Sequence, residues 1–433
     1  MKLYSLLTVL GLILATGLRA QDSLSLDQAI ELALANNFNI RLMKNETAIA
    51  ELNNTRANAG MLPVVTLNAG DNLTNALNFR QKLANGTELS RPFGLFNSFN
   101  ANVSTAWTFY DGGRMYLEKK RLETLSQQGA QELVQQLQQT IAETSIAWYA
   151  VARQQETLRN IDEVIAAVND RLQLASRRLD AGLGNKSDVL QAQIDLNDRR
   201  KDRIMAENAF EEARRQLNVL LAREPGIPFF ARKTALSLPE EPNVTALQQQ
   251  MLASNPALSV LETALQLAQI VEHQTQALNK PRLGLTGAYS FQRSDNTAGF
   301  SLSSSQHGPA VGVNFSMPLY TGGNLSRQAE VARVNVESAS LRIEQAQHEL
   351  VRQLLNLAGR SKALRQSLTT DQQSLAYARE YLMIATERFR QGQSIALEIR
   401  EAQLALENAL YRMNQTMYDL LMTDVQLRAL LVQ

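Results

Sequence analysis

Phe109-Tyr-Asp-Gly-Gly-Arg114 and Leu319-Tyr-Thr-Gly-Gly-Asn324 share one pattern, in which an aromatic residue precedes a polar residue and two glycines. The glycine pairs, Gly112-Gly113 and Gly322-Gly323, lie 210 residues apart. Each pair follows alternating apolar and polar residues and precedes a long stretch typical of a helix. Glycine suits a strand-to-helix junction, because it adopts backbone angles that are closed to other residues.

Other landmarks recur with almost the same offset, which indicates an internal repeat. They are Asn37-Phe38 with Asn255-Pro256, Pro63 with Pro281, and R-L-D-A-G at 178–182 with R-F-R-Q-G at 388–392. The offset is 218 residues for the prolines and 210 residues for the later landmarks, so the first copy has about eight extra residues between them. We expect two structural repeats, 21–222 and 246–433, joined by an irregular, proline-interrupted connector at 223–245.

The segments before the glycine pairs have the period of a strand and predict β-hairpins at 64–110 and 282–320. Each alternating run lasts about ten residues, which is the length that a tilted strand needs to cross a membrane. Aromatic residues lie near the strand ends, where interfacial aromatics are found: Trp107, Phe109, Tyr110 and Tyr320. A soluble sandwich is the alternative, but it needs a second sheet to cover its apolar face.

The segments after the glycine pairs predict long helices at 114–179 and 324–389, which contain no proline. At 1.5 Å per residue, each of them would be about 100 Å long. Gly182 and Gly392 interrupt the pattern, and Ser187 and Ser394 are placed to cap return helices at 186–221 and 395–430. A further helical segment precedes each hairpin and ends near Ala59 or Leu278.

The N-terminus and the composition limit the possible functions. Residues 1–20 have the layout of a secretory signal peptide, with an apolar run that is too short for a membrane anchor. A net charge of +1 gives no reason to expect a nucleic-acid partner, and the absence of cysteine excludes thiolate chemistry. The chain has three histidines, and none has a neighbour at the spacing of metal ligands: His273, His307 and His348. We also find no catalytic motif, so we expect no bound metal, no cofactor and no enzymatic activity.

Four strands cannot close a sheet within lipid, where an open edge leaves backbone groups unpaired. The smallest outer-membrane barrels have about eight strands, so the chain must oligomerise. Two copies would supply eight strands and three would supply twelve, and the larger number leaves an appreciable lumen. The polar residues that alternate with the apolar ones suit a water-filled interior.

Over essentially its whole mature length the chain resembles the TolC family of outer-membrane efflux proteins. The resemblance rests on the repeated helices and on four short segments: 27–37, 110–113, 318–323 and 181–193. It implies a mainly α fold with transmembrane β-strands, in which a homotrimer forms a twelve-stranded β-barrel in the outer membrane and a twelve-helix α-barrel in the periplasm. It also implies docking, through a periplasmic adaptor, to an inner-membrane pump.

The resemblance assigns roles at the turns between the long helices. The turns would form the periplasmic tip and contact the adaptor: Ala181, Gly182, Leu183, Gln391, Gly392 and Gln393. Glu398 and Glu401, three residues apart on one helix face, match acidic rings at the pore entrance. Asp188 matches a carboxylate that helps to hold the tip shut, but its usual Tyr and Arg partners are replaced by Phe389 and Ser394, so the familiar lock is in doubt.

The resemblance therefore implies a passive exit duct for an efflux or type I secretion system. Cargo cannot be read from the sequence, because the pump and adaptor select it. The alternatives are an autonomous outer-membrane diffusion porin, which would conduct without partners, and a non-conducting helical scaffold, which would need no apolar hairpins.

Overall fold

A computed structural model describes residues 22–232 and 241–431, so the expected signal peptide at 1–20 lies outside the described residues. The described residues fall into two compact units. Unit 1 comprises the chain up to Asn45, Gln131–Ser259 and the chain from Gln345 onward, and unit 2 comprises Glu46–Ala130 and Val260–Glu344. Each unit therefore takes segments from both halves of the sequence.

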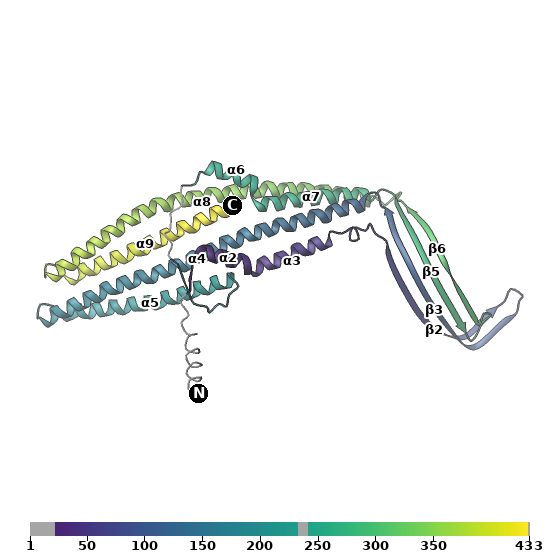
Figure 1. Cartoon of the computed structure of the whole chain (residues 1–433), viewed down its shortest axis with the longest axis horizontal. Helices are drawn as coiled ribbons and strands as arrows, with labels where there is room; N and C mark the ends of the chain where they lie inside the picture. The colour runs from purple at the N-terminus through teal and green to yellow at the C-terminus, as the bar shows by residue number, and fades with distance from the viewer. Residues whose placement is uncertain (1–21, 233–240, 432–433) are drawn as a thin grey trace, which may run out of the picture. The chain divides into compact units, whose positions relative to one another are not determined.

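Figure 1 shows two successive sets of elements with the same order, each consisting of short helices, a hairpin and two long helices. The first set is α2 (Leu26–Asn36), α3 (Phe38–Asn53), β2 (Val64–Lys82), β3 (Glu88–Tyr110), α4 (Arg114–Asp180) and α5 (Lys186–Leu220). The second set is α6 (Val244–Ser254), α7 (Pro256–Ala277), β5 (Arg282–Asn296), β6 (Ser303–Ser316), α8 (Asn324–Arg390) and α9 (Ala396–Ala429). The longest helices, α4 and α8, have 67 residues each.

Equivalent asparagines make equivalent contacts in the two sets. Asn37 ends α2, and its side-chain amide donates to the Leu220 carbonyl oxygen at 2.8 Å. Asn255 ends α6, and its amide donates to the Leu430 carbonyl oxygen at 3.0 Å. In each case the side-chain oxygen also accepts a backbone N–H two residues later. The repeat seen in the sequence is therefore a repeat of contacts as well as of elements.

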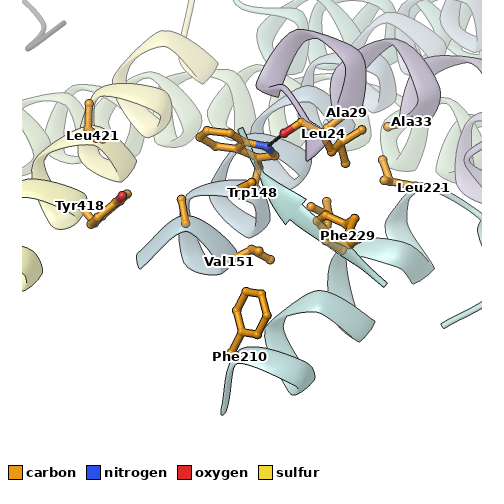
Figure 2. Packing of buried hydrophobic residues seen from close by; sticks show 13 residues of the cluster. Leu24, Ala29, Ala33, Trp148, Val151, Phe210, Leu221, Phe229, Tyr418 and Leu421 are labelled. Atoms are coloured by element: carbon orange, nitrogen blue, oxygen red, sulfur yellow. Dashed lines mark hydrogen bonds between the residues drawn. The ribbon is translucent and has the colours of Figure 1, made fainter. Parts of the chain in front are cut away.

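Unit 1 has a core around a small parallel sheet, in which β1 (Asp22–Leu24) pairs with β4 (Phe229–Ala231). Figure 2 shows the Trp148 indole N–H donating to the Leu24 carbonyl oxygen, at 3.0 Å, with Phe229 and Leu221 packed nearby. Trp148 is buried, so this bond satisfies a polar group that water cannot reach. Sequence reasoning placed β4 inside an irregular connector, because a three-residue strand has too few residues to show alternation.

Unit 2 contains a four-stranded antiparallel sheet in the order β2-β3-β5-β6. The strands are longer than the expected ten residues, with lengths of 19, 23, 15 and 14 residues. β6 ends at Ser316, which leaves Tyr320 outside the strand whose end it was expected to mark. Before β2, α3 ends at Asn53 rather than near Ala59, because residues 55–60 form turns that close on the positive-φ Gly60. In the described part of the chain, no helix is apolar enough over a sufficient length to cross a membrane.

Candidate functional site

The four-stranded sheet of unit 2 has an apolar face. Residues that pair in an antiparallel ladder point to the same side, so the register defines rows across the sheet. Three such rows are Val65–Thr105–Gly287–Val311, Leu67–Val103–Tyr289–Pro309 and Ala69–Ala101–Phe291–His307. Large side chains in these rows are exposed, Leu67 to 72%. An uncovered apolar face of this kind requires a nonaqueous environment or a partner.

The alternate rows of the same sheet are polar. They are Asn68–Asn102–Ser290–Gly308, Gly70–Asn100–Gln292–Gln306 and Asn72–Ser98–Ser294–Ser304. In one of these rows the Gln306 side-chain amide donates to the Gln292 side-chain carbonyl oxygen at 3.0 Å. One face thus suits lipid and the other suits water, as the alternation in the sequence predicted. The outer strands, β2 and β6, each have a sheet partner on one side only within the described residues.

The paired glycines lie between a hairpin and a long helix. Gly112 and Gly113 separate β3 from α4 and have φ values of +76° and +92°, and Gly322 and Gly323 precede α8 with φ values of +63° and +77°. These angles are in the left-handed region that favours glycine. Gly112 is also crowded, because a Cβ added there would lie 2.5 Å from Lys280 Cβ.

The two long hairpins end in turns with the same backbone geometry, and each turn has a glycine at positive φ, Gly182 or Gly392. In the α4–α5 turn, the Gly182 and Leu183 N–H groups donate to the Leu179 and Arg178 carbonyl oxygens at 2.9 and 2.8 Å. The α8–α9 turn repeats this pattern 210 residues later, from Gly392 and Gln393. This pair of bonds is the Schellman arrangement, which satisfies the last carbonyls of α4 and α8.

The return helices begin differently from the expectation. The N-cap of α5 is Asn185, whose side-chain oxygen accepts the Ser187 N–H at 3.1 Å, so Ser187 is not the cap. The N-cap of α9 is Ile395, which makes no side-chain capping bond. The Ser394 hydroxyl is buried without a hydrogen-bond partner among the described residues. The expected serine caps were wrong because each helix starts one or two residues away from the position that the serine would need.

One residue reaches from the first turn to the second. The Arg178 guanidinium donates to the Phe389 carbonyl oxygen, and its carbon lies 4.8 Å from the centroid of the Phe389 ring. Phe389 itself is 3% exposed and packs with an apolar cluster formed by α8 and α9: Ala385, Ile399 and Ala402. The structure thus places Phe389 against Arg178, whereas no hydrogen bond or ion pair joins it to Asp188 in the described part of the chain. In the sequence, Arg178 is marked only by its place in the repeated segment at 178–182.

The two candidate entrance glutamates have different surroundings. Glu398 Oε1 accepts from Arg388 at 2.6 Å, and its side chain is 22% exposed. Glu401 is exposed and makes no hydrogen bond or ion pair within the described ranges. Of the two carboxylates, Glu398 is therefore compensated by a cation and Glu401 presents its full charge to solvent.

A partly buried ionic cluster further along the hairpins joins α4, α5 and α9. The Arg171 side chain is 3% exposed and donates to Asp195, which also lies 3.3 Å from the Arg400 guanidinium. Burial raises the pKa of Asp195, but hydrogen bonds from Arg171 and Gln191 outweigh this effect and leave the pKa below its ordinary value. From the sequence alone, acidic residues on the long helices are expected to form solvated faces and intersubunit pairs, because periodicity does not identify a partner on another helix of the same chain.

In the described ranges, no three of the metal-binding types His, Cys, Asp and Glu are grouped closely enough to hold a metal ion. The histidine side chains illustrate this, since His307 lies on β6 near the ring of Tyr289 rather than beside other possible ligands.

A model of the family described as "Outer membrane efflux protein" matches residues 29–223 and 247–432 of the chain. The outer membrane protein TolC of Vibrio cholerae is 26% identical over 384 residues, covering 86% of this chain and 83% of that protein. The alkaline protease secretion protein AprF of Pseudomonas aeruginosa is 24% identical over 263 residues, covering 60% of this chain and 54% of AprF. These relatives are outer-membrane and secretion proteins rather than enzymes.

Among solved structures, the Campylobacter jejuni CmeC outer membrane channel is similar to this chain, with a TM-score of 0.77. The two are 16% identical, and the match covers 94% of this chain and 85% of that one. This likeness shows that the chain has the fold of an outer-membrane channel subunit.

Proposed function

The chain belongs to the outer membrane efflux protein family, and we propose that it forms a trimeric outer-membrane duct for substrates delivered by an inner-membrane transporter through a periplasmic adaptor. The observation that carries this proposal is the two-faced sheet of unit 2, with apolar rows on one side and polar rows on the other. In lipid, the free edges of β2 and β6 must pair, and neighbouring copies of the same sheet supply partners.

Three copies of the four-stranded sheet would contribute twelve strands. The polar rows would then line a lumen wide enough for water, while the apolar rows would face lipid. Two copies would give eight strands, a number at which side chains fill the interior. The trimer is therefore the smallest assembly in which the polar face of the sheet would line a water-filled lumen wide enough to conduct.

The tip turns are the proposed contact with the adaptor, and their form supports this role. Leu183 and Ile395 are large apolar residues that are exposed beside the glycines of the two turns. An uncovered apolar side chain at the end of a helical hairpin can insert between the helices of a partner. The proposed partners are thus a helical adaptor at the turns and an inner-membrane pump that supplies energy and selects the cargo.

Glu401 is the proposed main carboxylate of the pore entrance. It lies in the second turn of α9, close to the α8–α9 turn, and would form a ring of three charges under threefold symmetry. Glu398 would contribute less, because Arg388 compensates its charge.

The duct is tested by reconstituting the purified protein from outer membranes into planar bilayers. We expect pores with small conductance in the absence of partners, because a closed tip restricts ion flow. Large, steady conductance of the wild-type protein alone would instead favour an autonomous diffusion porin. Failure to insert into bilayers under any condition would contradict both channel hypotheses.

A further inference from the structure

We propose that Arg178 is a latch that holds the α4–α5 turn and the α8–α9 turn of one chain together, so that its release lets the turns separate. The inference rests on the proposed function, because in a duct these turns form the end that must open. The side chains at the positions matched to the family's tip lock do not supply a hydrogen bond between the turns here. Phe389 has no side-chain hydrogen-bonding group, and the Ser394 hydroxyl is without a partner in the described ranges.

The latch is a single guanidinium with three contacts. One nitrogen of Arg178 donates to the Phe389 carbonyl oxygen, at the end of α8. The other terminal nitrogen lies 3.5 Å from the Leu183 carbonyl oxygen, in the α4–α5 turn. The planar group stacks on the Phe389 ring at 4.8 Å. The same side chain therefore contacts backbone from both turns and a ring from the second.

The electrostatics of the site explain why a cation lies there. α4 ends at Asp180 and α8 ends at Arg390, so two helix C-termini meet at the contact. Each C-terminus has a partial negative charge from its last carbonyl groups, and two such ends side by side repel each other. A cation between the ends removes this repulsion and is stabilised by both.

The chemistry of arginine suits these contacts better than that of lysine. A guanidinium can donate in its plane and stack on a ring through its face at the same time, whereas an ammonium group cannot. The ring is held in place, because Phe389 is buried among apolar residues of α8 and α9 with Leu174 of α4 packed against them. The Phe389 ring and carbonyl therefore present a fixed surface to the guanidinium of Arg178.

Other charged residues at the turns bond within their own hairpin. Arg388 pairs with Glu398, and Arg390 pairs with Glu387. Arg178, by contrast, donates a side-chain hydrogen bond from the end of α4 to the Phe389 carbonyl oxygen at the end of α8. Removing it should loosen both turns while leaving each hairpin intact.

Hydrogen exchange with mass spectrometry, on the full-length protein in detergent, tests the latch through the turn amides of Gly182 and Leu183 and of Gly392 and Gln393. For Arg178→Ala we expect both turns to exchange about tenfold faster than in the wild type, since a charged hydrogen bond and the stacking on Phe389 are lost. Arg177→Ala is the matched control, because Arg177 is an exposed neighbour in the same last turn of α4. Its exchange should stay within about twofold of the wild type.

The exchange rate of the α8–α9 turn in Arg178→Ala distinguishes a latch between the turns from a cap of the first turn. A role of Arg178 confined to capping its own turn would speed exchange at Gly182 and Leu183 alone, and that result would overturn the latch. Phe389→Leu keeps the carbonyl and removes the ring, so it should loosen both turns less than Arg178→Ala does. Bilayer recordings separate the two proposals: a wild-type protein that never forms a pore refutes the duct, whereas an unaffected α8–α9 turn in a conducting protein refutes the latch.

Discussion

At the scale of single residues, the surroundings of Glu398 and Glu401 make different predictions for the two carboxylates. Glu401→Gln should lower the ratio of cation to anion permeability by roughly twofold, because it removes an exposed charge from each subunit of the proposed threefold ring. Glu398→Gln should have a smaller effect, since its charge is already compensated by Arg388 at 2.6 Å. Reversal potentials measured across a KCl gradient in planar bilayers give both ratios.

The order of the two effects is the informative result. A larger loss of cation preference in Glu398→Gln than in Glu401→Gln would mean that the Arg388 pair does not persist in the open channel. No change in either variant would remove both glutamates from the pore entrance.

Two glycines at equivalent junctions differ in the space around them. A Cβ at Gly112 would lie 2.5 Å from Lys280 Cβ and 2.9 Å from the Ala277 carbonyl oxygen, while nothing lies within 4 Å of the same atom at Gly322. Both positions have positive φ, so Gly322→Ala should cost about 1 kcal/mol from backbone strain alone. Gly112→Ala should cost at least twice as much, because steric overlap adds to the strain.

Thermal unfolding of the two alanine variants, followed by circular dichroism in the same detergent, measures this difference. Equal melting temperatures would contradict the close approach of Lys280 and Ala277 to the first junction.

At the scale of secondary-structure elements, the cluster of Arg171, Asp195 and Arg400 joins three helices. Asp195→Asn should destabilise unit 1 by about 3 kcal/mol, because it leaves the Arg171 guanidinium buried without a counter-charge. Asp202→Asn on the same helix is the matched control, since Asp202 is half-exposed and pairs with Arg199 at the surface. Chemical denaturation monitored at neutral pH compares the two variants.

The same carboxylate predicts a dependence on acid. The pKa of Asp195 in the folded chain lies below its ordinary value of 3.8, so the folded state favours the ionised form. Its contribution to stability is therefore fully present above pH 3.8 and is lost as the pH falls through the folded pKa. The stability of Asp195→Asn should fall less than that of the wild type between neutral pH and pH 3. If the stabilities of the wild type and of Asp195→Asn fell in parallel with pH, the ionisation of Asp195 would not be the cause of the loss of stability in acid.

Much of the element order could be predicted from the sequence, because helix and strand periods and glycine breaks are local signals. The lengths of β2 and β3 could not, since their distal halves lack clean alternation. There Asn78, with a φ of +54°, lies opposite Pro92 and interrupts the ladder. The missed strand β4 has three residues, and its pairing with β1 depends on segments about 200 positions apart.

The candidate site could be predicted only in part, for the same physical reason. Gly182 and Gly392 indicate turns, because each interrupts a helical pattern, and both have positive φ values in the structure. The contact between Arg178 and Phe389 joins positions 211 residues apart, and nothing in the local sequence of either residue indicates the other. Likewise, the compensation of Glu398 by Arg388 depends on how α8 and α9 turn back on each other.

At the scale of the whole molecule, the central feature is a four-stranded sheet whose edge backbone groups would have no hydrogen-bond partner if a single chain lay in lipid. It has an exposed apolar face, a polar face, and two outer strands with a free edge in the described structure. Every unpaired backbone group costs several kcal/mol in a membrane, so the proposed assembly would satisfy edges that one chain leaves open. In the proposed trimer, the turns between the long helices would be the surfaces that contact other proteins.

Native mass spectrometry of the protein extracted from outer membranes in detergent is the decisive test of the proposed assembly. We expect a single species containing three copies of the chain, stable in detergent because the edges of β2 and β6 would pair between copies. A monomer that retains its folded sheet in detergent would contradict it, since the sheet edges would then need no partner.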